Sequence, residues 1–270
     1  MKPVTLAAAD AYCRDLTKRH YENFIVASAL VRPDVRRDLA RVYAFCRTTD
    51  DLGDESTSRE EALTRLGRWR DELQAVFAGE TPVHPVLIAL RETIARAAIP
   101  HQLFLDLIGA NVQDQHVTSY PNWLQLEGYC KLSAAPVGRM VLAVFGVTDP
   151  RAPGLSDDVC IGLQLANHAQ DVKRDAQIGR RYLLDDEISA FGTSGAVRAL
   201  VERARRLLDS GRTLETIVPF ALSLQLRLYR KGGLAICRAI ERLDYHTEMR
   251  RPTVSTREKL AILLGSYVRT

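Results

Sequence analysis

The most restrictive feature of the 270-residue sequence is a helical spacing of apolar residues that continues along almost its whole length. Apolar residues recur three and four positions apart, which places them on one face of an α-helix. No segment of useful length shows the alternation of apolar and polar residues that is typical of a β-strand. The sequence therefore predicts an all-α protein.

Local signals divide this pattern into separate helices. Ser58 with Glu61, and Ser255 with Glu258, have the spacing of capping boxes, which begin helices. Proline and glycine residues mark the breaks between other helices. No Ser/Gly-rich linker or internal repeat divides the chain, so we expect residues 1–270 to form a single domain. The predicted helices span residues 5–18, 22–30, 34–53, 59–78, 85–98, 101–113, 122–145, 156–176, 195–211, 215–244 and 256–268.

Composition excludes several classes of protein. Hydrophobic residues make up 46% of the chain, which is enough for a sizeable core. The net charge is only +4, so the chain lacks the strongly basic balance of a nucleic-acid-binding protein. The five cysteines have no CxxC spacing, which indicates free thiols in a reducing compartment. Since no apolar run approaches the ~18–20 residues that span a bilayer, we expect a cytoplasmic protein, at most peripheral to a membrane.

The first candidate site lies in the sequence YAFCRTTDDLGDE, residues 43–55. Asp50 and Asp54 are four residues apart and share one helix face, and Asp51 and Glu55 repeat this spacing. Each pair of like charges at this spacing destabilises a helix by roughly 0.2–0.5 kcal/mol. A divalent cation would remove the repulsion, and Mg²⁺ prefers oxygen ligands. The motif therefore predicts a magnesium site.

The second candidate site lies in ANHAQDVKRD, residues 166–175, where Asn167, Asp171 and Asp175 are each four residues apart. One amide oxygen and two carboxylates suit a hard cation rather than zinc. Either motif alone could be an ordinary charged helix face, so the argument depends on their combination. Two oxygen-bearing stripes on separate helices are what a trinuclear magnesium–diphosphate site requires.

These motifs resemble those of the squalene/phytoene synthase family, whose members join isoprenoid diphosphates head to head. The resemblance covers nearly the whole chain, and the sequence is most similar to the hydroxysqualene synthase branch of the bacterial hopanoid pathway. It rests on HYENF (20–24), YAFCRTTDD (43–51), YCKLSAAPVGR (129–139), the Asn167–Asp175 stripe, GRRYL (179–183) and RKGG…IERLDY (230–245). The resemblance implies an isoprenoid synthase fold, a helical bundle around a central apolar cavity.

The resemblance also implies a reaction and partners. A carbon–oxygen lyase of this kind converts presqualene diphosphate and water to hydroxysqualene, releases diphosphate and needs Mg²⁺ but no NADPH. Its pathway neighbours are a presqualene diphosphate synthase and a hydroxysqualene reductase. The functional residues carry over by position. The metal ligands are Asp50, Asp54, Asn167, Asp171 and Asp175; the catalytic residues are Tyr43, Arg47, Tyr129, Gln164, Tyr182 and Glu22; the substrate-binding residues are His20, Phe24, Arg47, Gln164 and Gln170.

Two departures from related enzymes favour a substrate with one diphosphate. Glu22 stands where relatives that bind two farnesyl diphosphates commonly have Lys, and Gln170 stands where they commonly have Arg. Both changes remove positive charge near a diphosphate-binding region. Glu22 is also a carboxylate that could orient or deprotonate the attacking water, although it could equally pair with a nearby Arg. His168 and Ala169 replace the bulkier aromatic residues expected beside Asn167.

Two other functions stay open from the sequence. The chain could be a presqualene diphosphate or squalene synthase that condenses two farnesyl diphosphates, or a non-catalytic helical scaffold of the same fold. The intact stripe of Asn167, Asp171 and Asp175 argues against the scaffold.

Overall fold

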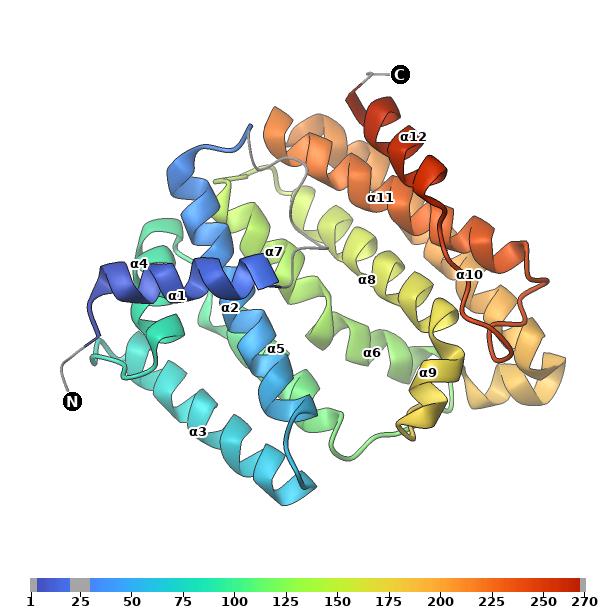
Figure 1. Ribbon diagram of the computed structural model, residues 1–270, viewed down its shortest axis with the longest axis horizontal. Helices are drawn as coiled ribbons and strands as arrows, with labels where there is room; N and C mark the ends of the chain where they lie inside the picture. Colours follow the sequence, from blue (N-terminus) through green and yellow to red (C-terminus); the bar gives the residue numbers. More distant parts are fainter. Residues whose placement is uncertain (1–3, 20–29, 268–270) are drawn as a thin grey trace. The chain divides into compact units, whose positions relative to one another are not determined.

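The computed structural model describes residues 4–19 and 30–267, and these ranges confirm the all-α prediction (Figure 1). They contain twelve helices, and the only β pairing among them is an isolated bridge between Tyr120 and Leu184. The helices are α1 (Leu6–Arg19), α2 (Pro33–Asp54), α3 (Arg59–Phe77), α4 (Pro85–Ala97), α5 (His101–Gln113), α6 (Trp123–Ser133), α7 (Ala135–Val144), α8 (Ala152–Gln170), α9 (Val172–Gln177), α10 (Asp185–Ile217), α11 (Phe220–Glu241) and α12 (Thr256–Tyr267). The helix predicted at 22–30 lies outside the described residues.

The predicted capping box at Ser255 is complete, whereas only half of the one at Ser58 forms, because the Glu61 carboxylate accepts from the Thr57 N–H rather than from Ser58. Ser58 accepts a hydrogen bond from the backbone N–H of Glu61 at the start of α3. Ser255 accepts one from the backbone N–H of Glu258, and the Glu258 carboxylate accepts one from the Ser255 N–H in return. These contacts satisfy backbone donors that the first turn of a helix leaves unpaired.

Four predicted helices differ from the structure. The predicted helix 215–244 is shorter, from Phe220 to Glu241, and its first three residues belong to α10. The predicted helix 122–145 is two helices, because Pro136 has no N–H and can stand only in the first turn of α7. The predicted helix 156–176 begins earlier, at Ala152, and divides into α8 and α9 at Asp171. The predicted helix 195–211 is too short, because α10 begins at Asp185 and continues through a kink at Gly192, where φ is 70°.

The helices form two compact units. Unit 1 comprises residues 1–116 with 136–148, and unit 2 comprises residues 117–135 with 149–270. In unit 1, α2 packs against α1, α3, α4 and α5. In unit 2, α8 packs against α10 and α11, with α6 and α9 beside α8 and α12 beside α11. The single domain expected from the sequence stays a prediction.

An aromatic core holds α2 in unit 1. Phe45 is fully buried and stacks on Trp69 with ring centroids 5.5 Å apart, and it meets Phe104 edge to face at 5.0 Å. The Trp69 indole N–H donates to the hydroxyl of buried Thr49 at 2.9 Å, so its polar end is satisfied. These contacts fix the helix that carries the first acidic motif.

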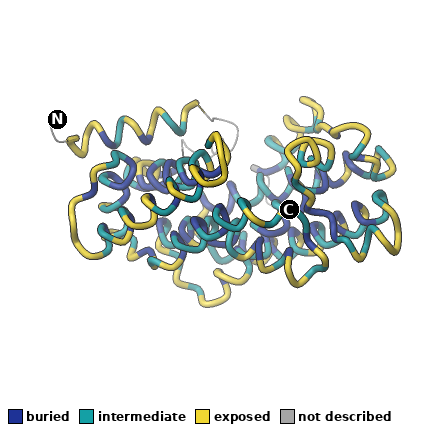
Figure 2. Tube along the Cα trace, turned by 90° about the horizontal axis from the view of Figure 1, so that it is seen from below, coloured by how far each residue is buried: buried dark blue, intermediate teal, exposed yellow. Residues whose placement is uncertain are grey.

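A buried cluster of charges attaches α1 to the rest of unit 1. The Arg41 guanidinium donates to Asp10 on α1 at 2.8 Å and to Asp38 at 3.1 Å. Asp38 also accepts from Thr93 at 2.6 Å and pairs with Arg96 at 2.6 Å. Because α1 buries only Ala9 and Cys13 and is otherwise largely exposed (Figure 2), these ion pairs are a large part of its attachment.

Close helix packing forms the core of unit 2. A Cβ on Gly211 of α10 would lie 2.4 Å from Val159 of α8. A Cβ on Gly162 of α8 would meet the Ala204 carbonyl oxygen at 3.1 Å. A side chain at Gly211 would force Val159 to move, and one at Gly162 would press on a backbone oxygen, so the two glycines allow α8 to pack closely against α10.

All five cysteines are free, and in the described ranges we find no helix with the length and apolarity needed to cross a membrane.

The buried cluster at Arg41 gives a stability prediction. Replacing Arg41→Met leaves two buried carboxylates with too few partners, so the free energy of unfolding should fall by about 3–5 kcal/mol. Urea denaturation measures this change. Arg70→Met is the matched control, because among the described residues the salt-bridge partner of Arg70 is exposed Asp71, and it should change stability by about 0.5 kcal/mol or less. A loss below about 1 kcal/mol for Arg41→Met would contradict the prediction.

Candidate active site

The first acidic motif occupies the last turns of α2, where α5 packs closely against it. The amide of Asn111 on α5 donates to the Asp50 carboxylate at 3.2 Å. A Cβ at Gly53 would lie 3.0 Å from the Asn111 side-chain oxygen, so Gly53 permits this approach. Asn111 is therefore a partner of the motif that local sequence patterns did not indicate.

The carboxyl group of Asp50 resists ionisation. Although Asp50 as a residue is exposed, the protein atoms packed around its carboxyl group remove water from it and raise its pKa to about 6. The negative charges of Asp54 and Asp51 raise the pKa further. The hydrogen bond from Asn111 and the charge of Arg47 act in the opposite direction. A cation beside Asp50 would favour its charged form.

Arg47 lies beside the neighbouring pair of acids. Its guanidinium pairs with Asp51 at 2.5 Å and with Glu55 at 3.6 Å, and its side chain is 33% exposed. Tyr43, one turn earlier on the same helix, is partly exposed, and burial raises the pKa of its hydroxyl. In this structure Arg47 thus offsets part of the negative charge of two of the four acids in the motif.

The second stripe crosses the junction of α8 and α9. Asp171 leaves helical geometry, with φ −101° and ψ 15°. The hydrogen bonds nevertheless continue, because the Asp171 N–H donates to the Asn167 carbonyl at 2.9 Å and the Asp175 N–H donates to the Asp171 carbonyl at 2.8 Å. The spacing of the three predicted ligands therefore survives the break.

Asp175 resembles Asp50 in its electrostatics. Burial and the charge of Asp171 together raise the pKa of Asp175 to about 6, while Arg174 and Arg180 oppose this shift. Each stripe thus contains a carboxylate whose charge the surrounding protein disfavours.

Gln170 and Asp171 contact a distant segment between α11 and α12. Arg251 pairs with Asp171 through its guanidinium, and it also donates to the Gln170 side-chain oxygen at 3.3 Å. The Gln170 amide donates to the Pro252 carbonyl at 2.8 Å and is 6% exposed. The sequence indicated Gln170 as a substrate-binding residue, and the structure gives it a role in holding this segment.

An aromatic group brings together two of the predicted catalytic residues. The ring of Tyr182 stacks on Tyr129 with centroids 5.8 Å apart and on Tyr120 at 5.8 Å. The imidazole ring of His168 also stacks on Tyr182, with ring centroids 3.7 Å apart. Burial lowers the pKa of His168 to about 3, so its imidazole is neutral. Tyr120 and His168 were not among the predicted site residues.

Gln164, also predicted, lies on α8 and connects to α6. Its amide donates to the hydroxyl of Ser133 at 2.8 Å. Because Ser133 follows Tyr129 by one helical turn, this contact ties α8 to the helix that carries Tyr129.

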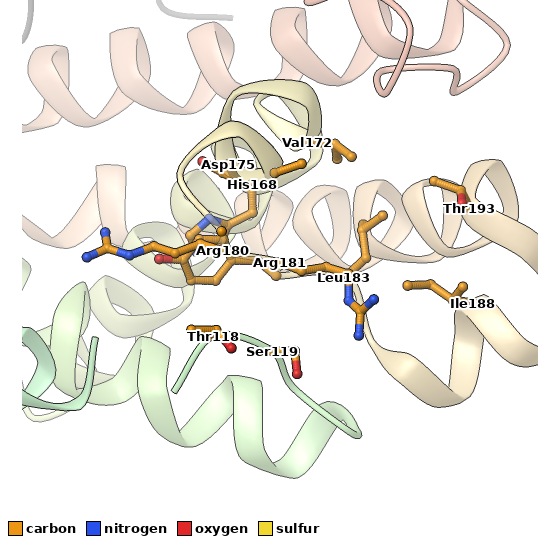
Figure 3. Close-up of a pocket in the computed structure, with 13 residues that line it drawn as sticks. Thr118, Ser119, His168, Val172, Asp175, Arg180, Arg181, Leu183, Ile188 and Thr193 are labelled. Carbon is orange, nitrogen blue, oxygen red and sulfur yellow. The ribbon is translucent and has the colours of Figure 1, made fainter. Parts of the chain in front are cut away.

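A cavity of about 470 Å³ lies beside these residues in unit 2 (Figure 3). Thr118 and Ser119 line one side, and Asp175 and Val172 lie on the opposite side. His168, Tyr182, Arg180 and Arg181 also line it, so the cavity joins the aromatic group to the end of the second stripe.

Three predicted residues cannot be placed. His20, Glu22 and Phe24 lie outside the described residues. Among the residues that are described, no group of three or more acidic, histidine or cysteine side chains gathers closely enough to hold a metal ion by itself. The oxygen donors of the two stripes could each bind a hard cation that completes its shell with other ligands.

Comparison with known proteins places the chain in context. Residues 17–258 match the family model described as squalene/phytoene synthase. A hydroxysqualene synthase of Sinorhizobium fredii is 35% identical over 209 residues, covering 72% of this chain and 70% of that protein. A phytoene synthase of Arthrospira platensis is 29% identical over 292 residues, covering 97% and 93%. The crystal structure of squalene synthase HpnC from Alicyclobacillus acidocaldarius has a TM-score of 0.84 and 42% identity, covering 90% and 97%.

The raised pKa of Asp50 predicts how the stability of the metal-free protein depends on pH. The carboxyl has a pKa of about 6 when folded and about 3.9 when unfolded, so its contribution to stability is present below pH 4 and is lost as pH rises through 6. In Asp50→Asn the side chain has no charge to acquire, so stability is not lost as pH rises through 6. The new amide oxygen can still accept the hydrogen bond from Asn111. The variant should be more stable than the wild type at pH 7.5, with the difference vanishing near pH 4.

Urea denaturation with chelator at several pH values tests this. Asp71→Asn, at an exposed acid on α3, controls for the change in net charge. A constant difference between Asp50→Asn and wild type across this range would contradict the prediction.

Proposed function

Because the chain belongs to the squalene/phytoene synthase family, we propose that it converts presqualene diphosphate and water to hydroxysqualene, with release of diphosphate. The observation that carries the proposal is the second stripe, whose predicted spacing survives the helix break at Asp171. The relative from Sinorhizobium fredii and the position of Gln170 support the choice of this reaction within the family.

The two stripes fit magnesium by the chemistry of their donors. Asp50 and Asp54 on α2, and Asn167, Asp171 and Asp175 on α8 and α9, would hold the ions. All five offer oxygen atoms, and the raised pKa values of Asp50 and Asp175 reflect carboxylates that a cation would stabilise. Bound Mg²⁺ supplies positive charge that stabilises the departing diphosphate.

The remaining residues would bind and shield the substrate. Arg47 is a cation that can turn from Asp51 and Glu55 to a diphosphate oxygen. The rings of Tyr129 and Tyr182 offer faces that stabilise a carbocation by about 0.5–2 kcal/mol each. The packed rings also exclude bulk water, so that capture of the cation can be restricted to one position.

A coupling reaction is the second candidate. The Arthrospira platensis phytoene synthase aligns with 97% of this chain, which favours an enzyme that joins two isoprenoid diphosphates. A presqualene diphosphate or squalene synthase fed by farnesyl diphosphate belongs to the same class. Unlike the synthesis of squalene, the proposed reaction needs no NADPH, and it requires an upstream presqualene diphosphate synthase and a downstream hydroxysqualene reductase.

A substrate panel separates these functions. The purified protein with Mg²⁺ should convert presqualene diphosphate to an alcohol that mass spectrometry identifies as hydroxysqualene, and the yield should not depend on NADPH. Farnesyl diphosphate and geranylgeranyl diphosphate should give little product.

Each alternative has its own result in this panel. Product from farnesyl or geranylgeranyl diphosphate, without alcohol from presqualene diphosphate, would replace the proposal with a coupling enzyme. No diphosphate release from any substrate would favour the scaffold.

The metal stripes give a second prediction. Asp50→Asn and Asp175→Asn should each lower the rate of diphosphate release about 100-fold or more, because each removes a charged ligand needed as the C–O bond breaks. A colorimetric diphosphate assay measures this rate. Asp71→Asn should leave the rate unchanged, and equal rates for all three variants would remove the stripes from the mechanism.

A further inference from the structure

The segment between α11 and α12 is fastened to the second stripe at three points. Lys173 of α9 donates to the Met249 carbonyl at 3.1 Å, and Gln170 of α8 donates to the Pro252 carbonyl at 2.8 Å. Between these two anchors, Arg251 reaches Asp171. We call residues 249–252 the C-terminal strap.

The contact between Arg251 and Asp171 uses both oxygens of the carboxylate. The Arg251 Nε donates to Oδ1, and Nη2 donates to Oδ2 at 3.4 Å. The Asp171 side chain is only 18% exposed, whereas Arg251 is 50% exposed. A guanidinium with this two-point geometry is a stronger and more directional partner than a single surface charge.

A metal ion at the second stripe would have to bind at least one of these same two oxygens, because they are the donor atoms of the Asp171 side chain. A guanidinium and a divalent cation cannot both occupy the front of one carboxylate, since they would repel each other at that distance. Asp171 therefore cannot act as a metal ligand through this face while Arg251 holds it.

The backbone of the strap has anchors besides the contact of Arg251 with Asp171. Its two carbonyl anchors come from Lys173 and Gln170, so the Arg251 side chain can turn away while residues 249–252 stay in place. The half-exposed position of Arg251 leaves room in solvent for this movement.

We propose that Arg251 is the built-in counter-cation of the second stripe and competes with metal for Asp171. This rests on the proposed metal site. Metal ions alone then bind weakly, because each must first displace the guanidinium. In the free protein, Arg251 of the strap thereby balances the negative charge of Asp171. It also weakens the binding of metal ions to the stripe when no substrate is present.

Calorimetric titration with Mg²⁺ alone, without any isoprenoid, tests the competition. Arg251→Gln should bind Mg²⁺ about fivefold more tightly than the wild type, which is the upper range for loss of a partly exposed ion pair. Arg251→Lys keeps the charge but loses the two-point contact, so its affinity should fall between the two.

Arg250→Gln is the matched control, because it removes the same charge from the neighbouring position in the strap. Its Mg²⁺ affinity should stay close to that of the wild type, which separates competition at Asp171 from the general effect of net charge. In an Asp171→Asn background, Arg251→Gln should no longer change the affinity, because the contested carboxylate is gone. Thermal unfolding without Mg²⁺ verifies that each variant is folded.

The possible outcomes distinguish this proposal from the proposed function. Equal affinities for Arg251→Gln and Arg250→Gln, or weaker binding by Arg251→Gln, would overturn the competition while leaving the metal site standing. Absence of Mg²⁺ binding in the wild type and in every variant would overturn both. Tighter binding by Arg251→Gln that persists in the Asp171→Asn background would also overturn it, because the effect would not pass through Asp171.

Discussion

Repulsion between carboxylates on one helix face is the constraint around which this protein is organised. A helix places residues four apart in contact, so the acidic stripes would lose stability without positive charge nearby. The chain supplies that charge differently in its two units. In unit 1, Arg47 comes from the same helix and lies beside Asp51 and Glu55. In unit 2, Arg251 comes from a segment 80 residues away. The first arrangement is inseparable from the helix, whereas the second depends on the tertiary fold.

That difference explains how far the sequence could be interpreted. Helix type, the side-chain caps at Ser58 and Ser255 and the spacing of the two stripes depend on residues within a few positions of each other, and the structure has all of them. The pairing of Asn111 with Asp50 joins residues 61 positions apart, and no local pattern marks it. The pairing of Arg251 with Asp171 likewise joins distant positions, and no local pattern marks it. The break at Pro136 was visible in the sequence, but the apolar pattern continues across it and concealed the two helices.

Gln170 shows how one residue can have two explanations. From the sequence, it is a position where relatives commonly carry an arginine, so it suggests a loss of positive charge. In the structure its amide accepts from Arg251 and donates to the Pro252 carbonyl. An arginine has no acceptor and could not receive the bond from Arg251. Gln170 and the position of the C-terminal strap therefore depend on each other, and a change at one would require a change at the other.

The charge cluster at Arg41 has a consequence for shortening the chain. The cluster is balanced, with Arg41 and Arg96 against Asp10 and Asp38. Asp10 is its only member on α1, and α1 otherwise contributes little buried apolar surface. Trimming the first twenty residues to aid crystallisation would thus remove few hydrophobic contacts but would leave an excess positive charge in the interior of unit 1. The N-terminal helix therefore matters to unit 1 mainly because Asp10 balances the buried charge of Arg41, and not because of the apolar surface that it covers.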